Sequence, residues 1–383
     1  MHHDLIVFGE DWGGLPSSTQ HLISRLSSSR KVVWVNSIGL RQPSFNLRDC
    51  KRLLAKVSKI AFSPLQSPQQ SKENTAHPPS SFTIVNPITI PAPSSRVSRK
   101  LAEWLLVYQL RPLVKKLSLE NPVLWSSLPT AADLCGKLGE SSVIYYCGDD
   151  FGALAGVDHD VVLQHERVLV SKADKILAAS PTLCDKFPSD KCLLLPHGVD
   201  YDLFSNSAPR AKDLPDDGHP IAGFYGSLSN WLDYDLLKHV ITRLKHWRFV
   251  FIGNIEDERA HDILRLKNVI YLGQRPHNQL PSYSQHWDVS LLPFSDNLQI
   301  RACNPLKLLE YLATGKPVVT TPFPALKPYQ HLVQTVATSR QMVSALEKSI
   351  SGKNVKSTQQ LQEISTQTWD QRARDLTLLL EAL

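Results

Sequence analysis

Residues 301–321, RACNPLKLLEYLATGKPVVTT, carry in succession the signals of a loop, a short helix and a buried strand. Pro305 suits the first helical position, where its missing N–H would have no partner anyway, and Asn304 before it is a good N-cap. Gly315 supplies a left-handed stop, and residues 318–319 start an apolar strand. The stretch therefore predicts a short helix that leads into a strand.

The start of this helix has the chemistry of a phosphate site. Lys307 lies in its first turn and Glu310 one turn further in. The unpaired amides at Leu306 and Lys307, together with the positive end of the helix dipole, favour an anion. From these residues alone an ordinary amphipathic helix between two strands remains the alternative.

Length and composition indicate an ordinary globular protein of two domains. The 383 residues exceed what one core serves at roughly 150 residues per domain. The formal charge of +6 suits an anionic ligand or an acidic membrane surface, and no basic stripe with interleaved aromatics indicates nucleic acid. Six cysteines without a C-x-x-C pair favour reduced thiols. Without a signal peptide or an apolar run of about 20 residues, we expect a cytoplasmic protein, at most peripheral at the inner membrane face.

Short apolar runs rich in β-forming residues alternate with helical patterns in both halves, which predicts α/β domains with mainly parallel sheets. Two such domains create a cleft between the carboxyl ends of their sheets, where open α/β sheets bind ligands. A helix is expected near 47–61, and the Pro-rich residues 63–95 are expected to form a long loop. The expected division is an N-terminal domain at 1–205, a linker at 206–219, a C-terminal domain at 220–368 and a docked C-terminal helix at 369–383.

Several segments together resemble glycosyltransferases of the GT-B fold, family 4, and in particular the subgroup of teichuronic acid and related polysaccharide glycosyltransferases. They follow the family's order along nearly the whole chain: SVIYYCGDDFGAL (142–154), LPHGVDYDLF (195–204), IAGFYGS (221–227), WRFVFIGN (247–254) and ACNPLKLLEYLATGKPVVTT (302–321). The resemblance implies two Rossmann-like domains facing each other across a cleft, with the last helix returning to the N-terminal domain. It also implies that the C-terminal domain binds a nucleotide sugar, such as a UDP- or GDP-sugar, and that the N-terminal domain binds the acceptor.

The resemblance assigns roles to the opening stretch. Glu310 would accept hydrogen bonds from the ribose hydroxyls, and Leu306 and Lys307 would face the diphosphate. Many family members have an earlier glutamate that contacts the transferred sugar, but the matching residue here is Ala302. Arg301, Cys303 or Asn304 would then have to contribute. Many members also carry Arg and Lys in the loop that here begins at Gly226 and contains neither, so phosphate binding would depend on Lys307, Arg301 and backbone amides.

Two N-terminal segments are further candidates. Gly13 and Gly14 follow the first strand, where glycine lets the backbone approach a ligand, although a plain turn is an equal alternative. Asp149 and Asp150 end another strand and are candidate catalytic residues that position an acceptor hydroxyl or stabilise a cationic transition state. Their alternative is a helix cap.

Residues 96–117 predict a helix with a basic, partly apolar face, which suits docking on anionic lipid. A helix packed on its own domain with a solvated basic side is the alternative. No cluster has metal-ligand spacing and no D-x-D pair follows a strand, so a metal-independent reaction is expected.

The sequence thus predicts a glycosyltransferase that moves a sugar from a nucleoside diphosphate to a polysaccharide or lipid-linked glycan acceptor. By family analogy the anomeric configuration would be retained. Two other functions stay open. One is a nucleotide-sugar epimerase or hydrolase of the same fold, which would turn over the donor without an acceptor. The other is a nucleotide-sugar-binding protein whose catalysis has decayed, which Ala302 makes conceivable.

Overall fold

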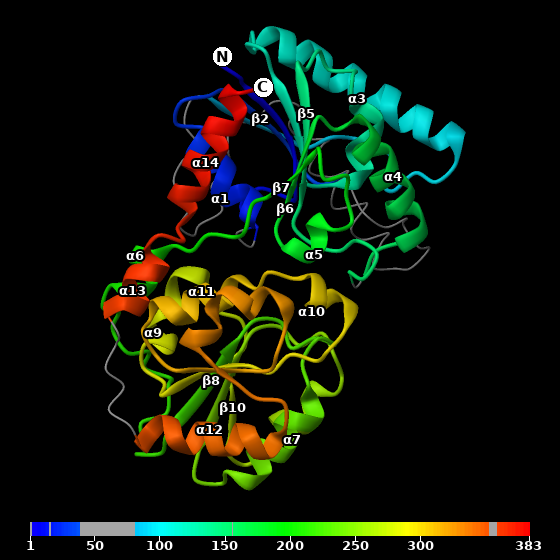
Figure 1. Ribbon diagram of the computed structural model, residues 1–383. Coiled ribbons are helices and arrows are strands. Elements are labelled where there is room, and N and C mark those ends of the chain that lie inside the picture. The colour runs from blue at the N-terminus through cyan, green and yellow to red at the C-terminus, as the bar shows by residue number, and fades with distance from the viewer. Residues whose placement is uncertain (1, 15–16, 39–80, 155, 352–357) are drawn as a thin grey trace.

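The structure, a computed structural model, describes residues 2–14, 17–38, 81–154, 156–351 and 358–383. It shows two α/β domains, one above the other in Figure 1, each built on a parallel sheet. The predicted fold class is therefore confirmed. The helix expected over 47–61 and most of the loop expected over 63–95 lie outside the described residues.

The first domain has, in its described part, a seven-stranded sheet of order β3-β2-β1-β4-β5-β6-β7. The strands are β1 (Leu5–Phe8), β2 (Val32–Val35), β3 (Phe82–Val85), β4 (Val123–Ser126), β5 (Ser142–Cys147), β6 (Lys175–Ala178) and β7 (Cys192–Leu194). Every residue of β1, β2 and β4 is buried, as expected for a parallel sheet covered on both faces. The strand order reverses between β1 and β4, and such switch points are where ligands bind.

Helices of the first domain lie on both sides of this sheet. They are α1 (Ser18–Leu26), α3 (Arg96–Lys116), η1 (Pro129–Leu134), α4 (His159–Lys172) and α5 (Pro181–Cys184). The long helix α3 begins with a capping box between Ser95 and Ser98, and it buries Ala102, Leu106 and Leu110 against the domain. Within the described part of the chain, no helix is both long and apolar enough to cross a membrane.

The second domain repeats the architecture with six described strands in the order β10-β9-β8-β11-β12-β13. These are β8 (Ile221–Tyr225), β9 (Arg248–Ile252), β10 (Val269–Tyr271), β11 (Val289–Leu292), β12 (Val318–Thr320) and β13 (Gln334–Thr335). Its helices are α7 (Tyr234–Arg243), α8 (Ala260–Leu264), η2 (His277–Gln279), α9 (Pro281–Ser284), α10 (Leu298–Ala302), α11 (Leu306–Ala313), η3 (Pro324–Leu332), α12 (Ser339–Ser351) and α13 (Thr358–Ser365). The switch point lies between β8 and β11.

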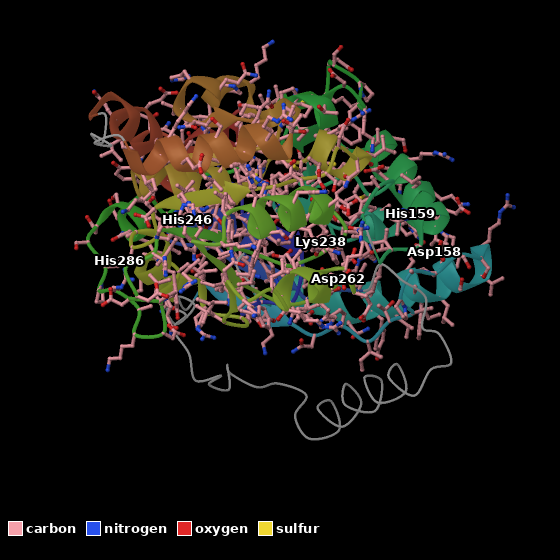
Figure 2. The ribbon with its side chains drawn as sticks, turned by 90° about the horizontal axis from the view of Figure 1, so that it is seen from below. Asp158, His159, Lys238, His246, Asp262 and His286 are labelled. Carbon is pink, nitrogen blue, oxygen red and sulfur yellow. The ribbon has the colours of Figure 1, made fainter. Side chains whose placement is uncertain are left out.

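The helices of the second domain differ in which side they occupy. Figure 1 shows α10 and α11 on the side toward the first domain, and α7 and α12 on the far side. The view from below in Figure 2 shows that far side, with the exposed Lys238 of α7 and Asp262 of α8. Any ligand held between the domains therefore meets α10 and α11.

The chain crosses between the domains twice, and the two crossings lie together. Val199 on the outgoing strand donates to the carbonyl of Gln367 on the returning one (2.8 Å). The returning chain ends in α14 (Trp369–Glu381), which packs on α1 and buries Trp369, Leu376 and Leu380 in the first domain's core. The predicted return of the last helix to the N-terminal domain is confirmed.

Residues 206–219, expected as the linker, pack on the second domain. Leu214 is part of that domain's core, and Ala211 donates its amide to Ser282 (3.0 Å). The preceding helix α6 (Tyr201–Ser205) buries Phe204 in the same core. Leu195 still packs in the first domain, so the change of core occurs between Leu195 and Val199.

Candidate functional site between the domains

The start of α11 lies where the carboxyl ends of the two sheets meet. In the first domain, Ala179 and Ser180 directly follow β6. The Asn304 side-chain amide donates to the Ala179 carbonyl (2.8 Å), and the Ser180 hydroxyl donates to the Ala302 carbonyl (2.6 Å). Leu306 packs against the first domain's core. The opening stretch thus contacts both domains at once.

The helix begins one residue later than the sequence indicates. Pro305 is the N-cap, without a side-chain capping bond, and Leu306 is the first helical residue. The expectation that Asn304 caps the helix was wrong, because its amide is bonded across the domain interface. The expected stop is confirmed, since Gly315 has a φ of +69°.

Lys307 extends over the backbone of the loop that follows β8. A Cβ on Gly226 would lie 2.2 Å from Lys307 Cε, and Gly226 has a φ of +134°. Gly253 is equally crowded, since a Cβ there would lie 2.1 Å from the Gly226 carbonyl oxygen. Only glycine at these two positions lets the lysine side chain lie so close to the loop.

The ammonium of Lys307 has no hydrogen-bond or ion-pair partner among the described residues, and none of them accepts from the amides of Leu306 and Lys307. The side chain is half-buried. Burial lowers the pKa of Lys307, and the charge of Glu310 offsets part of this effect. A cation beside free amides at a helix N-terminus is an arrangement suited to an anion such as phosphate.

Glu310 is 3% exposed, and both of its carboxylate oxygens are engaged. Oε1 accepts from His277 Nε2 (2.7 Å) and Oε2 accepts from the Tyr225 hydroxyl (2.6 Å). Sequence reasoning missed both partners, because they lie 33 and 85 residues away along the chain. Their positions after strands could have indicated them. Tyr225 ends β8 and His277 follows β10, so both lie at the carboxyl edge of the sheet.

The neighbouring candidates Arg301 and Ala302 are engaged elsewhere. The Arg301 guanidinium forms two bonds with the Asp296 carboxylate (2.6 and 2.7 Å), and both side chains are largely exposed. Phosphate would have to compete with Asp296 for it. Ala302 is buried in the first domain's core. Cys303 donates its thiol to the Ile300 carbonyl (3.2 Å).

Gly13 and Gly14 form an exposed turn after β1, at the switch point of the first sheet. Gly13 has a φ of +81°, and Gly14 donates its amide to the Asp11 carbonyl (3.2 Å). Asn36 accepts from the Trp12 amide (2.9 Å) and holds the turn. No hydrogen bond of the described residues joins this turn to Lys307 or Glu310.

The two candidate aspartates have different environments. Asp150 accepts from Lys186 and from the Gly152 amide, so it already has a structural role in its turn. Asp149 is exposed, its carboxylate has no hydrogen-bond or ion-pair partner among the described residues, and its charge acts on Cys303 of the other domain. The pKa of Asp149 is raised, because the protein atoms around its carboxyl group disfavour the charged form and Asp150 adds like-charge repulsion. Asp149 thus belongs to the space between the domains.

No group of three or more His, Cys, Asp and Glu side chains within the described ranges is arranged to hold a metal ion.

Comparison with solved structures identifies the fold to which these two domains belong. Two chains of known structure superpose over their full length: Anabaena HepE in complex with UDP and glucose (TM-score 0.68, 13% identity, 100% of both chains) and sucrose-phosphate synthase from Thermosynechococcus elongatus (TM-score 0.69, 14% identity, 100% of this chain and 99% of that one). At such identities the likeness concerns the fold alone. The fold is that of a GT-B protein.

A family match and a related sequence indicate which kind of GT-B protein this chain resembles. Residues 219–351 match the family described as Glycosyl transferases group 1. TuaH of Bacillus subtilis (strain 168), which bears the name of a teichuronic acid biosynthesis glycosyltransferase, is 29% identical over 250 residues. That alignment covers 58% of this chain and 63% of TuaH, which is less than two thirds of the relative. The chain is therefore a GT-B protein whose second domain is of the glycosyl transferases group 1 type.

Proposed function

We propose that the protein is a glycosyltransferase that moves a sugar from a nucleoside diphosphate to a polysaccharide or lipid-linked glycan acceptor. The observation that carries the proposal is the ammonium of Lys307, which has no partner among the described residues and stands at the start of α11, about one turn before Glu310 and between the two domains. Lys307 would bind the diphosphate and Glu310 the ribose of the same nucleotide sugar. The matches to glycosyl transferases group 1 and TuaH support the same activity.

The donor is proposed to be a UDP- or GDP-sugar bound mainly by the second domain. Solved relatives support a uridine nucleotide, since HepE is described in complex with UDP and glucose. In this chain Lys307 and the amides of Leu306 and Lys307 would hold the diphosphate, and Gly226 would let the lysine lie flat over the loop. Asn304 and Cys303 would border the transferred sugar, and Gly13 and Gly14 would approach it from the first domain.

The proposed reaction retains the anomeric configuration and needs no metal. The negative charge that develops on the departing diphosphate would be met by Lys307 and the helix dipole. Asp149, exposed toward the other domain, would position the acceptor hydroxyl or stabilise the cationic sugar. Asp150 would support Asp149 and not contact the substrate itself, because the Asp150 carboxylate is already bonded to Lys186 and the Gly152 amide.

The acceptor is proposed to approach along the first domain from a cytoplasmic membrane surface. Helix α3 exposes Trp104 and Tyr108 beside Lys100, Arg111 and Lys115. Aromatic rings next to cations on one helix face suit an anionic lipid interface. Peripheral contact through residues 96–117 would bring a lipid-linked acceptor to the protein.

Thermal-shift measurements with UDP-, GDP-, ADP- and dTDP-sugars test the donor site. One of them should raise the melting temperature of the wild type. Charge-assisted hydrogen bonds contribute about 1.5–3 kcal/mol, so Lys307→Ala should weaken binding roughly tenfold or more, and Glu310→Ala should abolish the shift. Lys348→Ala, which removes an exposed lysine on α12, should behave as wild type. If both site variants keep the full response, the donor site lies elsewhere.

An acceptor assay separates transfer from the other two functions. A transferase consumes the donor only when a suitable acceptor is present. Rapid turnover of donor without acceptor would favour the epimerase or hydrolase. Donor binding without transfer to any acceptor of a broad panel would favour the decayed binding protein, for which the buried alanine at position 302 is the supporting observation.

A further inference from the structure

The carboxylate of Glu310 is held by two side chains that no sequence motif identifies. His277 donates to one oxygen (2.7 Å) and Tyr225 to the other (2.6 Å), and all three residues come from different loops or elements of the second domain. A buried carboxylate requires such donors, because removal from water without them is costly. With so little of Glu310 exposed, these two bonds decide the direction of its remaining lone pairs.

Both donors are themselves fixed by ring contacts. His277 packs edge-on against Phe204 (5.4 Å between centroids) and faces His21 of the first domain (6.4 Å). Tyr225 packs edge-on against Tyr311 (4.7 Å) and stacks on Trp287 (6.1 Å). The backbone amide of Tyr225 also donates to the Tyr311 hydroxyl (3.0 Å). Neither donor can turn away without disturbing packed rings.

We propose that His277 is a positioning residue that orients Glu310 for the ribose hydroxyls of the donor nucleotide. A carboxylate has about four acceptor sites, and His277 and Tyr225 occupy two of them. Two remain, which equals the number of donors that the 2′- and 3′-hydroxyls of a ribose present. This inference rests on the proposed nucleotide-sugar site and specifies how that site selects a ribonucleotide.

The charges around His277 support an ion pair with Glu310. Burial lowers the pKa of His277, but the hydrogen bond and charge of Glu310 and the charge of Asp200 outweigh it, so the pKa lies above its ordinary value. His21 faces the same ring, but burial lowers its pKa to about 4 and keeps it neutral at physiological pH. Arg25 of the first domain forms an ion pair with Asp200 (3.0 Å). The His277 imidazolium is thus fully formed below about pH 6.5, the ordinary value, and is lost as the pH rises through the raised pKa.

Calorimetric binding of UDP and 2′-deoxy-UDP, or of GDP and 2′-deoxy-GDP if the guanine nucleotide binds, tests the positioning role. The wild type should prefer the ribonucleotide roughly tenfold, as expected for one hydrogen bond to a charged group. His277→Ala should reduce this preference to about twofold, and His277→Gln, whose amide can still donate, should retain most of it. His331→Ala removes another His–Glu contact of the same domain (3.0 Å to Glu363) and should change nothing.

The outcomes separate this inference from the proposed function. If no nucleotide binds the wild type, the donor site fails and the positioning role fails with it. If nucleotides bind but His277→Ala and His277→Gln both keep the wild-type preference, only the positioning role is overturned. Thermal denaturation of each variant shows that it is folded.

A nucleotide-free measurement gives an independent check. In an NMR titration of the full chain, the His277 imidazole, assigned by its absence from His277→Gln, should have a midpoint above the ordinary value of about 6.5. Glu310→Gln should lower this midpoint, because an amide cannot stabilise the imidazolium. A midpoint that Glu310→Gln leaves unchanged would contradict the pair.

Discussion

At the scale of single residues, the position of the Lys307 side chain depends on the absence of a Cβ at Gly226. Gly226 begins the loop after β8 and has no side chain, and the methylenes of Lys307 occupy the space that a Cβ would need. The close fit explains why the end of a lysine side chain in the first turn of α11 can lie against the loop after β8.

Replacing Gly226 by alanine should therefore impair donor binding. The new Cβ would displace Lys307, and the φ of +134° would add about 1–3 kcal/mol of backbone strain. We expect roughly tenfold weaker nucleotide affinity by calorimetry, equal to the loss of one charge-assisted contact. Gly218→Ala is the matched control, since its φ is +77° but no atom lies within 4 Å of its Cβ. Equal affinity in both variants would refute the clash.

At the scale of the element, α3 has two faces with different partners. Ala102, Leu106 and Leu110 are buried against the first domain. Val97, Leu101, Trp104 and Tyr108 recur at helical spacing on the opposite face and are exposed, Trp104 at 59% and Tyr108 at 71%. The two rings stack on each other (5.6 Å). Lys100, Arg111 and Lys115 fall on the same face, so exposed rings and cations share one side of the helix.

Vesicle co-sedimentation tests the proposed membrane contact of α3. The wild type should bind phosphatidylcholine vesicles that contain phosphatidylglycerol, and binding should fall as salt screens the charges. Trp104→Ala with Tyr108→Ala should weaken binding roughly tenfold, since two rings lose their apolar contact. Arg111→Glu with Lys115→Glu should weaken it further, by about 1 kcal/mol for each cation lost.

Leu378→Ala is the control for the vesicle experiment, because Leu378 is also exposed but lies on α14. It should bind as wild type. Vesicle binding that the α3 substitutions leave intact would exclude this face as the membrane contact.

At the scale of the whole molecule, the last helix connects the domains. The returning chain pairs with the outgoing one at Val199 and then docks α14 on α1 of the first domain. Trp369 is 1% exposed and stacks on His21 (4.7 Å), which in turn faces His277 of the second domain. The domain junction, the C-terminal helix and the candidate donor site thus share one cluster of side chains.

Trp369→Ala should destabilise the first domain. The large-to-small change leaves a cavity in its core and should cost about 3–5 kcal/mol, measured by urea denaturation of the full chain. Leu378→Ala on the same helix is exposed and should change the free energy of unfolding by no more than about 0.5 kcal/mol. A small effect of Trp369→Ala would mean that α14 docks weakly.

Local signals in the sequence were sufficient for much of the fold and pointed to part of the candidate site. Apolar runs of strand length, with helical periods between them, predicted both parallel sheets, because strands covered on two faces are apolar throughout. Gly315 correctly predicted where α11 ends. Lys307 and Glu310 were identified because a helix start is encoded within a few neighbouring residues. The polar, breaker-rich residues 206–219 pack on the second domain, a contact that their composition does not reveal.

What the sequence by itself determined is therefore the class of fold and the helix start that bears Lys307 and Glu310, since both depend on contacts between residues near each other in the chain. Only the tertiary structure decided which groups meet there. It placed Tyr225 and His277 on Glu310, turned Asn304 to the other domain, and paired Arg301 with Asp296. The bond of Asn304 depends on how the two domains come together, whereas Tyr225 and His277 reach Glu310 from 85 and 33 residues away along the carboxyl edge of the second sheet. No local sequence pattern encodes contacts between residues so far apart in the chain.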